Sequence, residues 1–332
     1  MNYKWNVLVT GGAGYVGSVL VPALLEQGHK VTVLDLYLYG ESALDSVRGH
    51  ENLREVKGDL RDEKIVKQAL DGCDCVIHLA CISNDPSFEL NPDLGKSINL
   101  DAFRPLVVMA RESGVKRFVY ASSSSVYGVK SEPAVTEDMS LEPLTDYSLF
   151  KAQCEKILAE ETRDDFVSLT IRPATVCGYA PRQRLDVIVN ILTNYAVNTG
   201  AVRVFGGEQK RPNIHVLDMV DAYLHVLQEP DEKINGKIYN VGDENHTVNQ
   251  LAEIVKTEVG GDIEIKVEPT EDNRSYHVSS ELILKELGWK PKHSIAEAVR
   301  GLAQALRAGK LPDSMNNPAY FNIKKMQETE LT

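Results

Sequence analysis

The first half of the chain alternates short apolar runs with longer stretches of helical periodicity. Residues 7–9, 30–35, 75–80 and 117–121 are rich in β-branched and apolar side chains, as buried strands are. Such alternation predicts an α/β fold, a doubly wound parallel sheet of the Rossmann type. In such a sheet the ligand binds across the carboxyl ends of the strands, so function is expected in the segments that follow them.

A glycine-rich turn follows the first strand. Gly11, Gly14 and Gly17 are evenly spaced, and a helical pattern occupies residues 19–25. Glycines so placed allow a tight turn, backbone approach to a pyrophosphate and close helix packing, and the helix start then faces the phosphates. The second strand ends in Asp35, which in isolation is also typical of a helix N-cap. After these glycines it predicts a hydrogen bond to a ribose hydroxyl and favours NAD over NADP.

Tyr147 and Lys151 are four residues apart, so a helix would place both side chains on one face. A free tyrosine has a pKa near ~10, and a neighbouring ammonium lowers that pKa enough for acid/base work. The spacing alone is more often that of a surface helix than that of a catalytic pair. The serine run at residues 122–125 follows the strand 117–121, and its position favours the catalytic interpretation.

With these features the chain resembles a known protein family. The chain is similar to the extended short-chain dehydrogenase/reductases, in particular to the NAD-dependent nucleotide-sugar epimerases and dehydratases, with UDP-glucose 4-epimerase as the nearest type. The resemblance runs from about Lys4 to about Pro291 and rests on residues 10–17, 58–60, 122–128, Tyr147 with Lys151, 172–175 and 211–218.

The resemblance implies a role for individual residues. Tyr147 would be the base, Ser123 would bind the reacting hydroxyl, and Lys151 would bind the nicotinamide ribose. Asp59 and Leu60 would contact the adenine, and Asn99 would support the active site. The full NAD site implied is Gly11, Gly14, Tyr15, Val16, Gly17, Asp35, Asp59, Leu60, Leu79, Ala80, Cys81, Asn99, Lys151 and Pro173.

Departures from the family pattern narrow the reaction. The 4,6-dehydratases carry an Asp-Glu pair where this chain has Ser124 and Ser125, and the decarboxylases carry a glutamate at the second of these positions. Neither serine is a carboxylic acid, which disfavours both reactions. Cys81, Cys177 and His215 are only weak candidates for the acid/base pair of a double epimerisation, and buried structural roles are the plainer interpretation.

The remaining chemistry is oxidation of a sugar hydroxyl, most often at C4, by Tyr147 and NAD. In an epimerase the hydride returns to the other face of the same sugar. In the alternative, a C4-dehydrogenase or 4-ketoreductase, the ketone is released or supplied from outside. A 4,6-dehydratase ranks lower, as does a non-catalytic NAD-binding protein on the same fold.

The second half of the chain is expected to hold a nucleotide-diphosphate sugar. Many 4-epimerases have lysine and asparagine where Ser83 and Thr175 stand, which puts a UDP-galactose 4-epimerase assignment in doubt. The cluster of Arg182 and Arg184 could meet the diphosphate, because the planar fork of arginine binds phosphate oxygens in pairs, although each arginine is also typical of a surface ion pair. The predicted substrate-binding residues are Ser83, Ser124, Thr175, Arg184, Arg211 and Arg274.

We expect three regions. Residues 1–175 form the NAD-binding Rossmann domain, and residues 216–242 are expected to return to it. Residues 176–215 and 243–310 form a smaller α/β substrate lobe, and residues 311–332 form a polar tail, either an extended arm or a partner contact. Resemblance to the family also implies a homodimer through helices near residues 102–113 and 149–160.

Composition agrees with this interpretation. A chain of 332 residues with 43% hydrophobic content can bury a large core. The net charge of −12 argues against nucleic-acid binding, and the absence of a long apolar run predicts neither a membrane span nor a signal peptide. Five cysteines without paired spacing predict reduced thiols in a cytoplasmic enzyme and no metal site.

Overall fold

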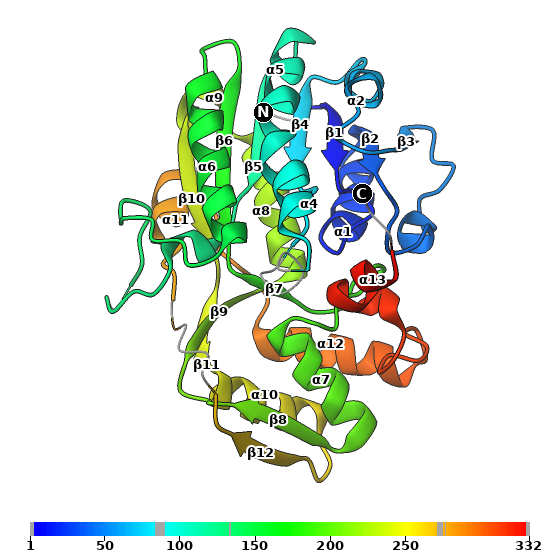
Figure 1. Cartoon of the computed structure of the whole chain (residues 1–332), viewed down its shortest axis with the longest axis vertical. Coiled ribbons are helices and arrows are strands. Elements are labelled where there is room, and N and C mark those ends of the chain that lie inside the picture. The colour runs from blue at the N-terminus through cyan, green and yellow to red at the C-terminus, as the bar shows by residue number, and fades with distance from the viewer. Residues whose placement is uncertain (1–2, 84–89, 133, 271–274, 276, 330–332) are drawn as a thin grey trace.

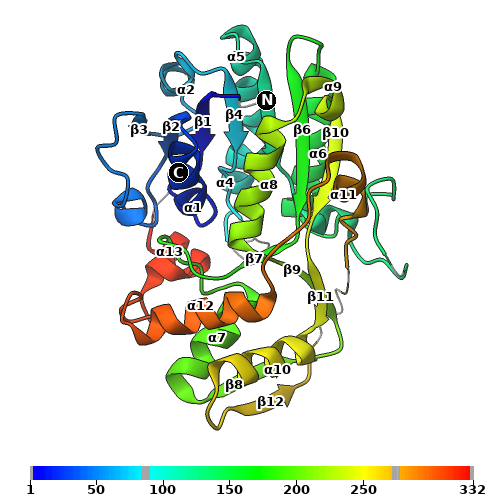
Figure 2. The same ribbon diagram turned by 180° about the vertical axis from the view of Figure 1, so that it is seen from behind.

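The computed structural model describes residues 3–83, 90–132, 134–270, 275 and 277–329. A large lobe is built on a seven-stranded sheet with helices on both faces, and a smaller lobe lies beyond the lower end of that sheet (Figures 1 and 2). All strand pairs of the large sheet are parallel, in the order β10-β6-β5-β4-β1-β2-β3. The predicted doubly wound α/β fold is therefore confirmed.

The elements of the large lobe follow the predicted alternation. Its strands are β1 (Asn6–Thr10), β2 (Lys30–Asp35), β3 (Leu53–Lys57), β4 (Cys75–His78), β5 (Arg117–Ala121), β6 (Val167–Pro173) and β10 (Lys237–Val241). Its helices are α1 (Gly17–Glu26), α2 (Glu63–Leu70), α4 (Pro92–Lys96), α5 (Phe103–Glu112), α6 (Asp146–Glu161), α8 (Val216–Gln228), α9 (Asp231–Ile234) and α11 (Glu281–Leu287), with a π-helical turn at Ser97–Asp101.

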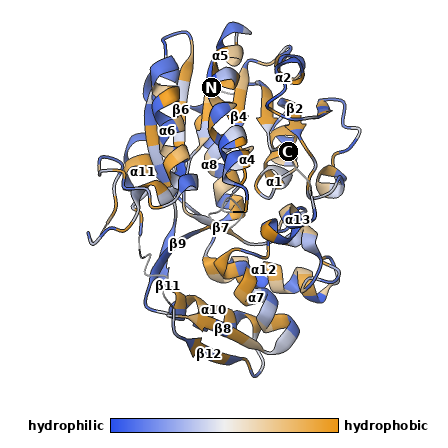
Figure 3. Ribbon diagram, in the orientation of Figure 1, coloured by the Kyte–Doolittle hydropathy of each residue, from blue (hydrophilic) through white to orange (hydrophobic). Residues whose placement is uncertain are grey.

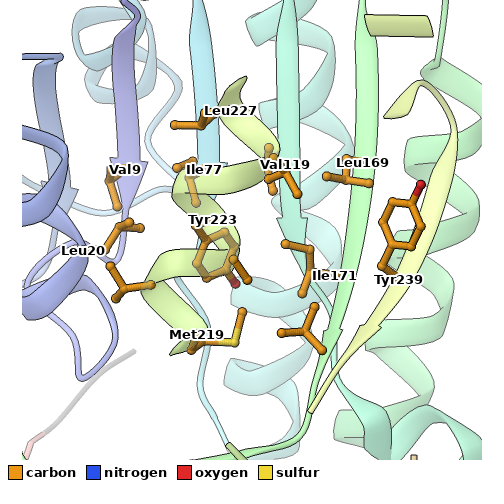
Figure 4. Packing of buried hydrophobic residues seen from close by; sticks show 14 of the residues in the cluster. Val9, Leu20, Ile77, Val119, Leu169, Ile171, Met219, Tyr223, Leu227 and Tyr239 are labelled. Atoms are coloured by element: carbon orange, nitrogen blue, oxygen red, sulfur yellow. The ribbon is translucent and has the colours of Figure 1, made fainter. Parts of the chain in front are cut away.

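Both faces of the central strands are buried, which explains their nearly continuous apolar sequences. Hydropathy colouring shows the apolar residues gathered on these strands and on the inner faces of the helices (Figure 3). On one face α1 and α8 cover the sheet, and Met219 and Tyr223 of α8 point toward Ile77 and Ile171 (Figure 4). Helices α2, α5 and α6 cover the other face.

The segment from α8 to β10 lies in the large lobe although it follows the first segment of the small lobe in sequence. Strand β10 pairs in parallel with β6, from Lys237 opposite Leu169 to Val241 opposite Pro173. The chain therefore crosses between the lobes several times, and both lobes contribute residues to the space between them.

The small lobe packs three helices on each other and on a short sheet. Helices α7 (Ile188–Thr199), α10 (Val248–Val259) and α12 (Ile295–Arg307) share one apolar cluster with β8 (Ala201–Phe205), which pairs with β12 (Glu264–Glu268). A second small sheet, β11-β9-β7, joins the lobes through β7 (Thr175–Cys177), β9 (Lys210–His215) and β11 (Glu244–Thr247). In the part of the chain that the structure describes, no helix has the length and apolarity needed to cross a membrane.

The C-terminal segment is not an extended arm. After α12 the chain turns back and ends in α13 (Asn322–Glu328), drawn in red beside the lower end of the large lobe in Figure 1. Met326 packs with Ile82, Leu94 and Ile98, which belong to the large lobe. Scattered apolar residues in a polar sequence thus hold the segment against the body of the protein.

A buried ion pair joins α6 to the large sheet. The guanidinium of Arg172 donates to both carboxylate oxygens of Glu155, at 2.7 and 3.0 Å, and both side chains are almost completely buried. Glu155 also accepts a hydrogen bond from Ser122, and Arg172 donates to the hydroxyl of Tyr127. Removing one member would leave the other charge buried without its counter-charge.

We therefore expect Glu155→Gln to lower the free energy of unfolding by about 3–5 kcal/mol, because Arg172 loses its compensating charge. Urea denaturation measures this. Glu160→Gln, on the exposed side of the same helix, breaks only a surface pair with Arg104 and should change the value by about 0–1 kcal/mol. Equal effects of the two substitutions would contradict the importance of the buried pair.

Candidate active site

A cavity of about 390 Å³ lies at the carboxyl ends of the central strands, between the two lobes. This volume is in the range of small-molecule sites. The cavity brings together most residues that the sequence predicted, which are Gly11, Gly14, Tyr15, Val16, Gly17, Asp35, Leu60, Leu79, Ala80, Cys81, Ser83, Ser123, Ser124, Tyr147, Lys151, Pro173, Thr175 and Arg184.

Three predicted residues do not line this cavity, and a fourth lies outside the described residues. The carboxylate of Asp59 is paired with the guanidinium of Arg61 and does not line the cavity. Asn99 also lies behind the wall, where its side chain hydrogen-bonds both backbone groups of Ile82. Arg211 lines a neighbouring cavity, and Arg274 lies outside the described residues.

One end of the cavity is formed by the glycine turn. Gly11 has a φ of +72°, and a Cβ there would lie 2.7 Å from the backbone nitrogen of Ala80. At Gly17 a Cβ would lie 2.5 Å from the carbonyl oxygen of Gly12. The turn can therefore close only with glycine at these two positions, and the amides at the start of α1 then suit a pyrophosphate.

Asp35 stands beside this turn at the end of β2. Its two carboxylate oxygens accept hydrogen bonds from the backbone nitrogens of Ala13 and Tyr37, at 2.9 and 2.8 Å. Burial raises the pKa of Asp35, and these hydrogen bonds partly oppose that rise. The glycine turn and the acid together fit the pyrophosphate and a ribose of NAD.

The other end carries the serine and the Tyr–Lys pair. Helix α6 begins at a capping box formed by Thr145 and Ser148, which fixes its first turn and with it Tyr147. The ammonium of Lys151 donates to the carbonyl oxygen of Ala121 at 2.6 Å and lies 5.9 Å from the centre of the Tyr147 ring. Ser123 hydrogen-bonds Ser125 and lines the cavity with the pair.

Two arginines that follow β7 form part of the wall between these ends. Arg184 pairs with Asp186 at 2.9 Å and donates to Ser83 at 3.2 Å. Burial alone would raise the pKa of Asp186, but the guanidinium of Arg184 outweighs it and holds that pKa low. Arg182 stacks on Tyr39 with its guanidinium carbon 3.7 Å from the ring centre, and burial lowers the pKa of Arg182 to about 10.

Sequence reasoning considered Arg182 together with Arg184 for a diphosphate, but it did not assign Tyr39 or Asn322 to the site. Tyr39 and Arg182 line the cavity, and so does Asn322 from the C-terminal segment. The Arg182-Gln183-Arg184 triplet is the local signal for Arg182. The aromatic pair Tyr320-Phe321 in an otherwise polar tail is the signal that this tail is packed, but nothing local marks Asn322 itself.

Carboxylates are scarce in the cavity. Of the described residues that line it, Asp35 is the one acid, and it stands at the glycine-turn end. Ser124 and Ser125 occupy the positions beside Ser123, so the wall near Tyr147 offers hydroxyls rather than acids. Within the described ranges, no three His, Cys, Asp or Glu side chains gather as metal ligands would. This fold and cavity are those of a dinucleotide-dependent enzyme.

Sequence comparison agrees with this class. The model of the NAD dependent epimerase/dehydratase family matches residues 7–242. A UDP-glucose 4-epimerase of Lactobacillus helveticus is 30% identical over 318 residues, covering 89% of this chain and 94% of its own. A dTDP-glucose 4,6-dehydratase of Streptomyces niveus is 28% identical over 315 residues, covering 89% of this chain and 90% of its own. The chain belongs to the NAD dependent epimerase/dehydratase family, and its cofactor is NAD.

Solved structures give the same result. The UDP-N-acetylglucosamine 4-epimerase of Methanobrevibacter ruminantium, in complex with UDP-N-acetylmuramic acid, has a TM-score of 0.83 and 27% identity, over 92% of this chain and 99% of that one. MoeE5, in complex with UDP-glucuronic acid and NAD, has a TM-score of 0.79 and 26% identity, with the same coverage. Both share the fold of this chain across both lobes.

We expect Gly17→Ala to weaken NAD binding by about tenfold or more, equivalent to roughly 1.4 kcal/mol, because the new methyl group displaces the glycine turn. Titration of the protein with NAD by calorimetry measures this. Gly301→Ala is the matched control, since a Cβ there meets no atom within 4 Å and alanine favours the exposed helix. Unchanged NAD affinity in Gly17→Ala would contradict the placement of the pyrophosphate.

Proposed function

We propose that the protein is an NAD-dependent epimerase of a nucleotide-diphosphate sugar, which works by transient oxidation at C4. The observation that carries the proposal is the placement of Ser123, Tyr147 and Lys151 on the wall of the cavity that contains the glycine turn. A protein that only binds NAD would not need these three side chains together, so they favour an enzyme over a non-catalytic NAD-binding protein.

In the proposed reaction Tyr147 takes the proton of the sugar hydroxyl, and Ser123 holds that hydroxyl by a hydrogen bond. Lys151 is anchored by the carbonyl of Ala121, and its ammonium stabilises the phenolate and orients the nicotinamide ribose. Bound NAD supplies an acceptor for the hydride and a donor for its return. Tyr147 then gives its proton back to the oxygen of the epimerised sugar.

The substrate class is supported by the relatives and by the second cavity. The two solved structures described above hold UDP-linked sugars. In this chain a cavity of about 200 Å³ adjoins the main one through Ser125, Thr175 and Val187, and Arg211 lines it. We propose that the nucleotide and its diphosphate occupy this side, with Thr175 and Arg211 among their contacts.

A C4-dehydrogenase or 4-ketoreductase is the second candidate, because it needs the same three catalytic residues. The serines at 124 and 125 disfavour a 4,6-dehydratase, although dehydratases are among the relatives. The difference between the first two candidates lies in the fate of the ketone, which turns over inside the site in an epimerase and leaves it in a dehydrogenase.

We also propose a cytoplasmic homodimer. All five cysteines are free thiols, as in proteins of reducing compartments. On the outer surface of the large lobe, Leu100, Arg104 and Ile157 line a groove over the π-helical turn, α5 and α6. These helices lie where the family resemblance places the contact between two copies.

Tyr147→Phe should lower turnover by about 10²- to 10⁴-fold, because the hydroxyl that moves the proton is lost. NAD binding should stay within about twofold of wild type, since the glycine turn is untouched. Tyr195→Phe removes an exposed hydroxyl on α7 and serves as the control. Turnover that survives in Tyr147→Phe would show that another group is the base.

The fate of the hydride separates the two candidates. Wild-type protein is incubated with UDP-, GDP-, dTDP- and CDP-linked sugars while NADH absorbance and product NMR are followed. We expect one pair of 4-epimers to interconvert without net NADH formation. Net NADH accumulation with release of a ketone would instead identify a dehydrogenase, and no reaction with any of these sugars would contradict both.

A further inference from the structure

The C-terminal segment contributes a side chain to the active-site cavity. Asn322 begins α13, is almost completely buried and lines the cavity together with Ser83, Arg182 and Arg184. The helix is held there by Met326, which packs on Ile82 and Ile98 of the large lobe. The packing of Met326 therefore holds the helix that begins at Asn322 against the large lobe.

Asn322 hydrogen-bonds Ser83 and Asp186, the two residues that accept hydrogen bonds from Arg184. The amide nitrogen of its side chain donates to the hydroxyl of Ser83 at 2.9 Å, and its backbone nitrogen donates to Asp186 at 2.9 Å. Ser83 and Asp186 in turn accept hydrogen bonds from the guanidinium of Arg184. The side-chain oxygen of Asn322 accepts a further hydrogen bond from Arg182 at 2.6 Å.

One nitrogen of the Arg184 guanidinium lacks a hydrogen-bond partner among the described residues. This nitrogen, Nη2, is buried. A buried guanidinium nitrogen without a partner is costly, so such a group in a binding cavity is suited to an oxygen of the ligand. Arg184 lines the same cavity as Tyr147.

We propose that the C-terminal segment is a working part of the substrate site, in which Asn322 positions Arg184 so that its unpartnered nitrogen binds an oxygen of the sugar. Asn322 is thus a positioning residue, and Arg184 is the residue that contacts the substrate. This inference rests on the proposed function, because it takes a nucleotide-linked sugar as the ligand.

The test is a double-mutant cycle with the panel sugar that wild-type protein turns over most efficiently. Asn322→Ala should raise KM about tenfold, and Arg184→Gln should raise it by at least as much. If Asn322 acts through Arg184, the double variant should have the KM of Arg184→Gln alone within about twofold. The kcat and the bound NAD should change far less than KM in Asn322→Ala.

Asn316→Ala is the matched control, since Asn316 lies in the same segment but is exposed and hydrogen-bonds only Asp313 in its own loop. A KM of Asn322→Ala within about twofold of wild type, or fully multiplicative effects in the double variant, would overturn the inference while leaving the proposed function intact.

Two further outcomes are decisive. If Asn322→Ala does not fold, Ser83→Ala carries the same test, because it removes the hydroxyl shared by Asn322 and Arg184 without altering the C-terminal segment. We expect a raised KM there, and an unchanged KM overturns the inference. Failure of wild-type protein to turn over any panel sugar would overturn the proposed function and this inference together.

Discussion

The end of the cavity that carries Tyr147 and Lys151 depends on the buried pair of Arg172 and Glu155. The pair joins α6, which carries Tyr147 and Lys151, to β6, and the hydrogen bond from Ser122 adds the end of β5, where Ser123 follows. Burying two charges costs several kcal/mol per ion, and an apolar pair would stabilise the fold as well. An apolar pair would not, however, fix the orientation of α6. The bidentate contact fixes the rotation of α6 against the strand ends, and so fixes Tyr147 relative to Ser123.

The cofactor end is joined to the substrate lobe by direct hydrogen bonds. The hydroxyl of Tyr15, within the glycine turn, donates to the carbonyl of Gly178 and accepts from Asn190 of α7. The backbone nitrogen of Arg182 donates to Ser18 of α1. The loop that carries both arginines is therefore seated on the helix whose start faces the pyrophosphate. A shift of the substrate lobe would move the glycine turn and the arginines together, so the two halves of the site keep their spacing.

The sequence predicted the features that local patterns encode. The strands, the glycine turn, Asp35 and the Tyr147–Lys151 pair depend on residues within a few turns of one another, and the structure places them at one cavity. A contact of Asp59 with the adenine stays a prediction, since its carboxylate pairs with Arg61 while its neighbours Gly58 and Leu60 line the cavity. Asn322 reaches Ser83 across 239 positions of the chain, and no local period can signal such a contact. The stacking of Arg182 on Tyr39 escaped prediction for the same reason.

Strand β10 joins the large sheet from a late position in the sequence, and this has a consequence for folding during synthesis. Until residues 237–241 emerge from the ribosome, β6 presents an unpaired edge, and until residues 216–228 emerge, the part of the sheet face later covered by α8 is also bare. An open strand edge beside bare apolar surface is a template for association between chains. The nascent protein therefore passes through a stage of synthesis in which six strands of the sheet can pair while the edge of β6 is still open. Chaperone protection would matter most during that interval.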